Sequence, residues 1–581
     1  MKTPFIITTL VGIFFFLGQL SATETITVNG KPFVVNNEGK AIAWIFFTDK
    51  GPRQRLNKLT PEQMLTERSL RRRQKVAQDN RLTDFRDYPV YASYIRFLQP
   101  LVDRIRVRSR WLNAVSVETD PINLTVIQNL SFVKNVSPVR PTRKPKPQPE
   151  RPAEQSDVPP KKTSALDYGN SIKQIQLINS DVLHDMGFYG QGVLICMLDD
   201  GFYRLYSHTV FDSLNIVATW DFINSDTTVD DNNYGGEGTH GTKTLSTIGG
   251  YAPGDLIGTA FKASFLLAKT EVDSSETQVE EDYWVAGIEW ADSLGADIVS
   301  SSLGYIDWYT WEDMDGNTAV TTKAADIAVG KGMLVFNSAG NEYDNADHNT
   351  LIAPADGDSV MAVAATDEFG VRASFSSVGP SADGRIKPDI AAMGSGVVCA
   401  SQYSDSEFTT SSGTSFSCPI AAGGAAQLLT AFPDSPPELI MEALRNTASH
   451  SQQPDKYYGW GVIDLEEAYN YLNNTSVLNG HISAQKTEGF YLYKNYPNPF
   501  NASTKIRFQL IQPGTVELVV YNVQGRRILN ENLGLQPVGK QSDYILNMNA
   551  QASGVYYYDV FVRDARSGAV YQKTGKMVLL K

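Results

Sequence analysis

The sequence predicts a chain whose central part is an α/β domain with a doubly wound parallel sheet, and three observations support this. Between residues 164 and 481, short strands that are apolar throughout alternate with helical patterns, as in sheets covered on both faces. A proline-rich segment, 141–163, separates this region from a smaller α+β domain at 23–140. The tail, 490–581, has the alternating β-branched and aromatic residues of a small β-sandwich.

The first segment, 1–22, is predicted to be a secretory signal peptide. Lys2 precedes an apolar run from Phe5 to Leu17, and small residues follow at Ser21–Ala22. The run is short for a membrane span, and polar sequence comes directly after it. A retained N-terminal anchor is the alternative interpretation.

The composition is that of an ordinary globular protein, with 42% hydrophobic and 20% charged residues, which excludes wholesale disorder, collagen and a coiled coil. The net charge of −13 is unevenly distributed. Residues 23–140 hold 20 basic against 11 acidic residues, whereas residues 164–481 hold 12 against 44. So acidic a main body is unlike that of a nucleic-acid-binding protein, and the opposite charges favour association of the two domains.

The first domain, 23–140, is predicted to have the β-α-β-β-α-β order of the ferredoxin-like fold. A basic helix is expected at 61–78, after Thr60 as N-cap and Pro61 in the first turn, and a short helix from Pro121. The three arginines 71–73 are interpreted as a solvated helix face. The strands are expected at 41–48, 104–110, 113–118 and 132–139.

The linker and the central domain follow. Seven of the 23 residues at 141–163 are proline, so this segment is expected to be extended, exposed and open to proteolysis. Helices of the central domain are expected at 278–295 and 321–332. Because ligands bind at the carboxyl ends of the strands in such sheets, the site is expected there. The strands are expected at 192–199, 263–269, 296–304, 332–340 and 359–366.

The tail is expected to form about seven strands, separated by turns that contain Pro, Asn and Gly. The residues predicted to pack in its core are Ile506, Phe508, Val519, Tyr521, Val555 and Tyr557. Three cysteines, Cys196, Cys399 and Cys418, are too few for a disulfide framework. They stand among apolar or small residues and are interpreted as buried packing residues, with one pairing left open.

Four residues of the central domain have the chemistry of an acyl-transfer site. Asp199 ends an apolar strand, His240 lies in a Gly-rich approach to a helix, Ser415 begins a small-residue helix, and Asn341 lies just past a strand end. A serine hydroxyl needs a base, histidine is that base near neutral pH, and a carboxylate fixes its tautomer. The Asn341 side chain and the Ser415 backbone N–H can stabilise an oxyanion. Each motif alone is compatible with a turn or a helix cap, but together they predict a serine hydrolase site.

The order Asp, His, Ser and the surrounding motifs resemble the subtilisin-like (subtilase) serine peptidases. The resemblance covers residues 190–465 through GQGVLICMLDDG, GEGTHGT, SSLG, SAGN, GTSFSCPIAAG and YGWGVIDLEEA. It implies a seven-stranded parallel sheet and peptide-bond hydrolysis through an acyl-enzyme, with Asp199, His240 and Ser415 as the triad and Asn341 as the oxyanion residue. It also implies that one wall of the S1 pocket is Ser302, Leu303 and Gly304, and that the other is Ala339 and Gly340.

Two positions depart from the family pattern. Asp200 follows Asp199 where bacterial subtilisins have Ser or Thr, and this leaves open which aspartate orients His240; Asp199 is preferred because it ends the strand. Residues 244–246 read Thr-Leu-Ser where the family usually has Val-Ala-Gly. This second change is expected to alter helix packing without removing a catalytic group.

The flanking domains also resemble known modules. Subtilases carry an N-terminal inhibitory propeptide of split β-α-β form, which assists folding and is then removed, and residues 23–140 resemble it. The tail resembles the sorting domain of type IX (Por) secretion cargo through LYKNYPNPFNASTKIRFQL and KTGKMVLLK. This implies export across the outer membrane to the cell surface or the medium. An ordinary β accessory domain or a carbohydrate-binding domain is the alternative for the tail.

The resulting prediction is a secreted serine endopeptidase that uses no cofactor and acts on proteins and peptides. Its expected partners are its own propeptide and the outer-membrane secretion machinery. A catalytically inactive surface binding protein on the same fold is the competing class. An α/β-hydrolase esterase is excluded, because no Gly-x-Ser-x-Gly surrounds Ser415. The charge of Glu342, beside Asn341, favours a basic side chain at P1, the substrate residue before the cleaved bond. A structural calcium ion and a solvated acidic loop are both compatible with Asp221, Asp226, Asp230 and Asp231.

Overall fold

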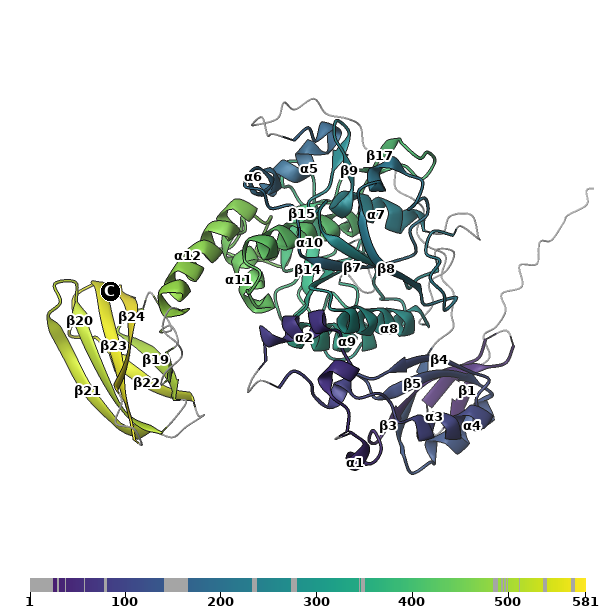
Figure 1. Cartoon of the computed structure of the whole chain (residues 1–581), viewed down its shortest axis with the longest axis horizontal. Helices are drawn as coiled ribbons and strands as arrows, with labels where there is room; N and C mark the ends of the chain where they lie inside the picture. Colours follow the sequence, from purple (N-terminus) through teal and green to yellow (C-terminus); the bar gives the residue numbers. More distant parts are fainter. Residues whose placement is uncertain are drawn as a thin grey trace, which may run out of the picture. The chain divides into compact units, whose positions relative to one another are not determined.

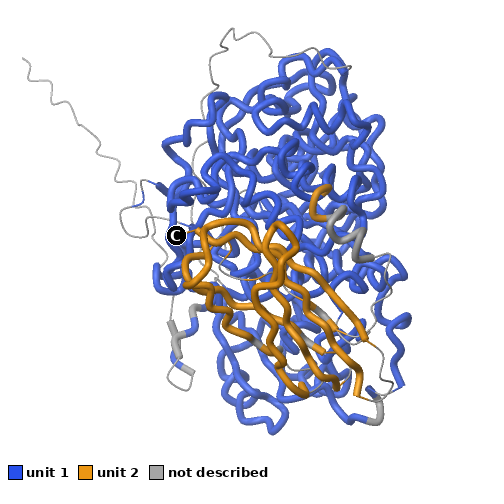
Figure 2. The backbone as a smooth tube through the Cα atoms, turned by 90° about the vertical axis from the view of Figure 1, so that its left-hand side faces the viewer, with its two compact units in different colours: residues 1–472 blue, residues 473–581 orange. Residues whose placement is uncertain are grey.

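In a computed structural model, the chain forms two compact units, residues 1–472 and 473–581, which Figure 2 colours separately. The predicted signal peptide and proline-rich linker lie outside the described residues. Within the described part, no helix is both long and apolar enough to cross a membrane. The structure describes residues 25–28, 31–36, 38–56, 58–77, 81–139, 166–231, 238–272, 279–343, 345, 351–483, 490–492, 495, 498, 500–510, 513–536, 541–565 and 570–580.

A seven-stranded parallel sheet forms the centre of the first unit, in the order β15-β14-β13-β12-β7-β11-β8 (Figure 1). The strands are β7 (Leu194–Asp199), β8 (Asn215–Asp221), β11 (Ser264–Lys269), β12 (Ile298–Ser301), β13 (Leu334–Ser338), β14 (Met361–Thr366) and β15 (Ile390–Met393). The five strands predicted from apolar runs are all present, each shorter than its predicted range. The chain builds β8 and β11 on one side of β7 and the other four on the opposite side. The carboxyl end of β7, which bears Asp199, therefore lies where the winding reverses.

Helices cover both faces of this sheet. Helices α8 (Val279–Leu294) and α9 (Val320–Gly330) lie on one face, and α7 (Thr239–Gly249) and α10 (Thr414–Ala431) on the other (Figure 1). A Cβ atom added to Gly423 of α10 would come within 1.9 Å of Thr259 Oγ1, so small residues let this helix pack closely. The remaining elements of this domain are α5 (Ile172–Gln176), α6 (Ser180–Asp185), β9 (Tyr251–Ala252), β10 (Leu256–Ile257), β16 (Val397–Ala400), β17 (Phe408–Ser411) and α11 (Pro437–Thr447). Helix α12 (Leu465–Ser483) begins in this unit, and its residues from Asn473 onward belong to the second unit.

The N-terminal domain has the predicted ferredoxin-like sheet, in the order β4-β5-β3-β6. Its helices α3 (Ala92–Leu98) and α4 (Pro121–Gln128) pack on the sheet through Ile95, Leu98, Leu124 and Ile127. The prediction that the basic stretch 61–78 is the first crossover helix was wrong. That stretch forms η1 (Pro61–Gln63) and α2 (Glu67–Gln74), and α2 has one apolar residue, so it cannot cover a sheet. The strands are β1 (Thr25–Val28), β2 (Lys31–Val34), β3 (Ala41–Phe47), β4 (Arg104–Ser109), β5 (Ala114–Thr119) and β6 (Val133–Val139), and α1 is Arg53–Leu56.

Helix α2 instead packs against α8 of the central domain, and this corrects the interpretation of the three arginines. Arg72 and Arg73 are 2% and 3% exposed, and both bind the buried carboxylate of Asp292 on α8. Arg110, next to β4, binds the same carboxylate at 2.9 Å. Only Arg71 of the three faces solvent, where it lies 3.4 Å from Glu67. Basic residues of the N-terminal domain and an acidic residue of the central domain therefore form a buried ionic cluster between the two domains.

The second unit contains a sandwich of a three-stranded sheet, β18-β19-β22, and a four-stranded sheet, β21-β20-β23-β24. Ile506 and Phe508 lie in its core cluster as predicted, and Val519 is also buried, but Tyr521, Val555 and Tyr557 are not. Their neighbours point inward instead, because an error of one residue reverses every side chain of a strand. The strands are β18 (Phe490–Leu492), β19 (Ser503–Leu510), β20 (Gly514–Asn522), β21 (Arg527–Gln536), β22 (Gln541–Asn547), β23 (Gly554–Asp564) and β24 (Val570–Leu579).

Candidate active site

The four residues that the sequence singled out come together at the carboxyl edge of the parallel sheet. Asp199 is the last residue of β7, and His240 is the second residue of α7. Ser415 is the second residue of α10, and Asn341 follows the end of β13. Two strand ends and two helix starts therefore position the candidate groups.

Asp199 and His240 form the central pair of the site. Asp199 Oδ1 lies 2.6 Å from His240 Nδ1, and the aspartate is fully buried while the imidazole is 31% exposed. Burial by itself would raise the pKa of Asp199, but the adjacent His240 and the donors Asp200 N and Thr244 Oγ1 outweigh it, so this pKa lies below that of an ordinary aspartate. The carboxylate is therefore ionised and fixes the orientation of the imidazole.

Glycine at position 241 allows this close approach of α7 to β7. A Cβ atom placed on Gly241 would lie 1.9 Å from the carbonyl oxygen of Gly201 and 3.0 Å from Asp199 Cβ. Any side chain here would push the helix, and His240 with it, away from the strand.

The second aspartate has a different partner. Asp200 Oδ1 accepts a hydrogen bond from the backbone N–H of Gly241 at 2.8 Å, and Oδ2 accepts one from the N–H of His240 at 3.4 Å. Both donors belong to the first turn of α7, whose N–H groups have no partner within the helix. Asp200 thus holds the start of the helix, and Asp199 holds the imidazole.

Thr244 is a member of this site that the sequence reasoning missed. Its hydroxyl donates a 2.8 Å hydrogen bond to Asp199 Oδ2, the oxygen that faces away from His240. The departure from the family pattern at this position therefore places a donor on the aspartate, beyond a change in packing. The spacing could have revealed it, since Thr244 follows His240 by four residues and lies on the same helix face.

We expect Thr244→Val to lower kcat about 10-fold and to leave KM unchanged. Valine keeps the shape but removes one of the donors that orient Asp199. A less stabilised carboxylate also attracts the imidazolium proton more strongly, so the acid limb of the pH profile of kcat/KM should move to higher pH. Kinetics between pH 5 and pH 10 measure both effects.

Two variants serve as controls. Thr244→Ser restores the hydroxyl and should restore the pH profile. Thr247→Val removes a buried hydroxyl one turn further along α7, which donates only to the carbonyl of Thr244 at 2.7 Å. An equal loss of kcat in Thr244→Val and Thr247→Val would assign the effect to helix packing.

Ser415 and Asn341 meet at the start of α10. Ser415 Oγ donates to the carbonyl oxygen of Ser302 at 3.3 Å, and Ser302 Oγ donates to the carbonyl of Ser415 at 2.8 Å. Asn341 Oδ1 accepts hydrogen bonds from the N–H and the hydroxyl of Thr414, at 3.0 and 3.2 Å. Because the carboxamide oxygen is held by Thr414, its NH₂ group is directed away from Thr414 and can donate to a ligand. The backbone N–H groups of the first turn of α10 are further donors at this place.

The predicted pocket walls lie beside these residues. Ser302, Leu303 and Gly304 follow β12, and Ala339 and Gly340 follow the adjacent β13. The carbonyl of Leu303 accepts from Asn337 Nδ2 at 2.9 Å, and Gly340 N donates to Thr414 Oγ1 at 3.2 Å. The structure therefore brings all five wall residues next to Ser415 and Asn341.

The acidic loop before His240 is largely held by the protein itself. Asp221 accepts hydrogen bonds from the backbone of residues 223 and 224, and Asp231 lies 2.7 Å from Lys269 Nζ. Asp226 accepts from the N–H of residue 228, and Asp230 is part of no metal-like cluster among the described residues. Among the described residues, the group whose spacing could hold a metal ion is Asp199, Asp200 and His240 at the candidate site, and its atoms make the hydrogen bonds given above.

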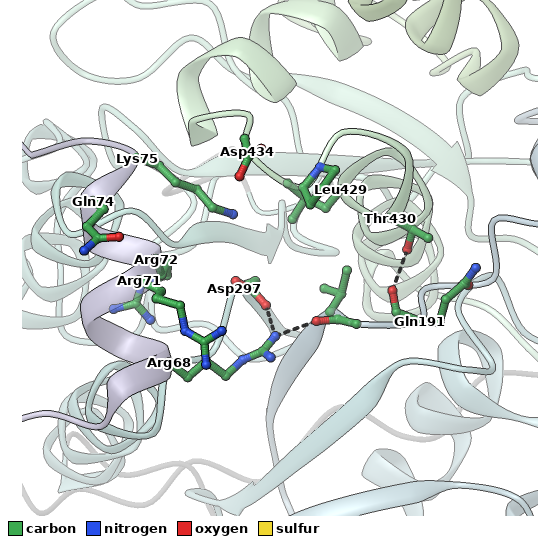
Figure 3. A pocket seen from close by; sticks show the side chains of 13 residues that line it. Arg68, Arg71, Arg72, Gln74, Lys75, Gln191, Asp297, Leu429, Thr430 and Asp434 are labelled. Carbon is green, nitrogen blue, oxygen red and sulfur yellow. Dashed lines mark hydrogen bonds and ion pairs between the residues drawn. The ribbon is translucent and has the colours of Figure 1, made fainter.

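A cavity of about 630 Å³ lies elsewhere, between α2 and the central domain (Figure 3). Arg68 extends across it to the carboxylate of Asp297 and to the carbonyl of Gly192, the latter at 2.8 Å. None of the candidate residues lines this cavity. It belongs to the contact between the N-terminal and central domains.

Comparison with known proteins gives three family matches along the chain. Residues 190–461 match the subtilase family, residues 42–156 match a peptidase S8 propeptide domain of Bacteroidota, and residues 494–573 match a secretion system C-terminal sorting domain. The matches follow one another in the order that the sequence predicted.

Two subtilisins agree with the central match. The chain is 32% identical to subtilisin DY of Bacillus licheniformis over 294 residues, which cover 51% of this chain and 97% of that protein. It is 31% identical to subtilisin E of Bacillus subtilis over 306 residues, 52% of this chain and 73% of that protein. A solved structure, a serine-to-alanine mutant of the protease domain of PatA, matches with a TM-score of 0.42 at 24% identity and covers 50% of this chain and 98% of that one.

Proposed function

This chain belongs to the subtilase family and is a serine endopeptidase, and we propose that Ser415 is its nucleophile, His240 its general base and Asp199 the carboxylate that orients the base. The observation that carries this assignment is the 2.6 Å contact between Asp199 Oδ1 and His240 Nδ1, made at the edge of the sheet where Ser415 begins α10. The contact leaves Nε2 as the nitrogen that can take a proton.

The reaction follows from these positions. Ser415 Oγ attacks the substrate carbonyl carbon while its proton passes to His240 Nε2, and Asp199 stabilises the imidazolium without being protonated. Collapse of the tetrahedral intermediate breaks the C–N bond, and the leaving amine takes the proton from His240. Water then attacks the acyl-enzyme by the same route and releases the acid. The proposed reaction uses no cofactor.

The oxyanion of each tetrahedral intermediate needs fixed donors. We assign this role to the NH₂ group of Asn341 and the backbone N–H of Ser415, because Thr414 orients the carboxamide and the helix start presents the N–H. We also propose that the backbone of the segment Ser302–Gly304 pairs with the substrate chain, which suits protein and peptide substrates.

A phosphonofluoridate probe tests the assignment. It reacts with activated serines, so it should label the purified enzyme once, and peptide mapping should place the label on Ser415. An inactive binding protein on the same fold would take up no label.

The N-terminal domain is a propeptide, and we propose that it inhibits the mature enzyme through the ionic cluster on α8. The buried carboxylate of Asp292 accepts contacts from Arg72, Arg73 and Arg110, all from the propeptide. Lys331 of the central domain reaches Asp87 of the propeptide at 2.8 Å in the opposite sense. Such pairs are costly to break singly, because the remaining charge is left buried.

Changing one arginine of the isolated propeptide should therefore weaken inhibition sharply. We expect Arg72→Met to raise the inhibition constant of residues 23–140, added to mature enzyme, by about 10- to 10²-fold. Asp292 keeps Arg73 and Arg110 but loses one buried charged hydrogen bond, which contributes about 1.5–3 kcal/mol. Arg71→Met is the matched control, because Arg71 is exposed and pairs only with Glu67 of its own helix; its constant should change less than about 3-fold. Equal effects of the two substitutions would contradict the proposed role of the cluster.

The tail is a sorting domain for type IX secretion, so the enzyme is exported to the cell surface or the medium. We propose the outer-membrane secretion machinery as its partner. All residues assigned to catalysis precede residue 416, so the sandwich supplies no group to the reaction.

A further inference from the structure

The two wall segments beside Ser415 each carry a glycine that faces the same side chain. Gly304 follows β12 and Gly340 follows β13, and the two strands are neighbours in the sheet. In the proposed reaction, a substrate carbonyl at Ser415 places the side chain of its own residue, P1, between these segments. Whatever occupies the space between the two glycines therefore limits the size of P1.

That space contains the side chain of Ile352. A Cβ atom placed on Gly304 would lie 2.1 Å from Ile352 Cδ1 and 2.3 Å from its Cγ1. A Cβ atom placed on Gly340 would lie 2.9 Å from Ile352 Cγ2. The isoleucine therefore contacts the backbone of both walls, with different branches of its side chain.

The backbone around Ile352 is fixed to both walls. Ile352 N donates to the carbonyl of Ala339 at 3.3 Å, and Ala353 exchanges two 2.9 Å hydrogen bonds with Tyr305. The side chain also packs on a buried cluster that includes Ile306 and Met314. Because a β-branched side chain is restricted at χ1, Ile352 cannot easily turn aside for a substrate.

We infer that Ile352 closes the space between Gly304 and Gly340 and makes this peptidase select small P1 residues, namely Gly, Ala and Ser. The inference rests on the proposed function of Ser415. It replaces the expectation of a basic P1 residue drawn from Glu342, since a lysine or arginine stem would have to pass the isoleucine before its charge could act. Close packing of this kind discriminates by volume, because a side chain that does not fit loses contacts in the transition state.

Peptide p-nitroanilides that differ only at P1 test the inference on enzyme purified after its own maturation. Wild-type kcat/KM should be at least 10-fold higher for Ala than for Phe or Lys. Ile352→Gly should raise kcat/KM for Phe at least 10-fold and change the value for Ala less than about 3-fold. Ile352→Ala should show a smaller increase in kcat/KM for Phe. It replaces the glycine variant in the test if that variant folds poorly. Titration of Ser415 with the phosphonofluoridate probe normalises each rate to the concentration of active sites.

Ile306→Val is the matched control, because it removes a methyl group from the cluster on which Ile352 packs and leaves the Ile352 side chain itself unchanged. Its ratio of Phe to Ala rates should equal that of the wild type. A wild-type enzyme that prefers Phe or Lys, or an Ile352→Gly variant with an unchanged ratio, would overturn the inference while labelling of Ser415 leaves the proposed function standing. Absence of labelling and of cleavage for every P1 residue would overturn both.

Discussion

Ser415→Ala is expected to lower kcat about 10⁶-fold, the loss that removal of the nucleophile causes in subtilisin, a relative of this chain. The substitution removes the oxygen atom that attacks the substrate and forms the acyl-enzyme. The fold should persist, because the lost hydrogen bond from Ser415 Oγ to Ser302 is long, at 3.3 Å, and contributes about 1 kcal/mol or less. Single-turnover assays with a p-nitroanilide, together with the melting temperature, measure both quantities.

Ser417→Ala provides the comparison within the same helix turn. Its hydroxyl is buried and donates to the carbonyl of Thr414 at 3.0 Å, so its loss should affect stability more than chemistry. Activity above about one per cent in Ser415→Ala would show that the nucleophile is another residue.

Asp199→Asn is expected to lower kcat about 10⁴-fold, as in serine peptidases in which asparagine turns an NH₂ group toward the imidazole and selects the wrong tautomer. Asp200→Asn should cost less than about 10-fold, because an asparagine oxygen can still accept the hydrogen bond from Gly241 at the start of α7. The steady-state kinetics of the two variants therefore separate two adjacent aspartates that the sequence alone left open. A larger loss in Asp200→Asn would reverse their roles.

Local sequence pattern predicted some features of this molecule and not others. The strands of the parallel sheet were predictable because each is buried on both faces and is apolar throughout. Asp199, His240 and Ser415 could be singled out because their residue types suit acyl-transfer chemistry and stand at the ends of such elements, and the structure brings Asp199 and His240 into contact. In the tail, the run Tyr556–Tyr558 has no polar residue to mark its outer face, so the inward side of that strand was misassigned.

Other features depend on partners that are distant in the sequence. The burial of Arg72 depends on Asp292, which lies 220 residues further along the chain. In the sequence, Ile352 has no feature that distinguishes it from other loop residues, and only the structure shows that it lies between Gly304 and Gly340. The hydroxyl of Thr244 becomes informative only when α7 turns it toward Asp199. Contacts of this kind cannot be predicted from local composition, because they depend on how the whole chain folds.

The three cysteines are all free and buried in the structure, and this has a consequence for redox behaviour. Burial raises the pKa of Cys399 to about 11 and that of Cys418 to about 12, and it raises that of Cys196 further. Thiolate, the form that attacks disulfides and takes up oxidants, is therefore scarce at neutral pH. The protein can therefore cross an oxidising compartment without a disulfide catalyst and without protection from thiol exchange. Reducing agents should leave its activity intact, even though Cys418 is three residues from Ser415 in the sequence.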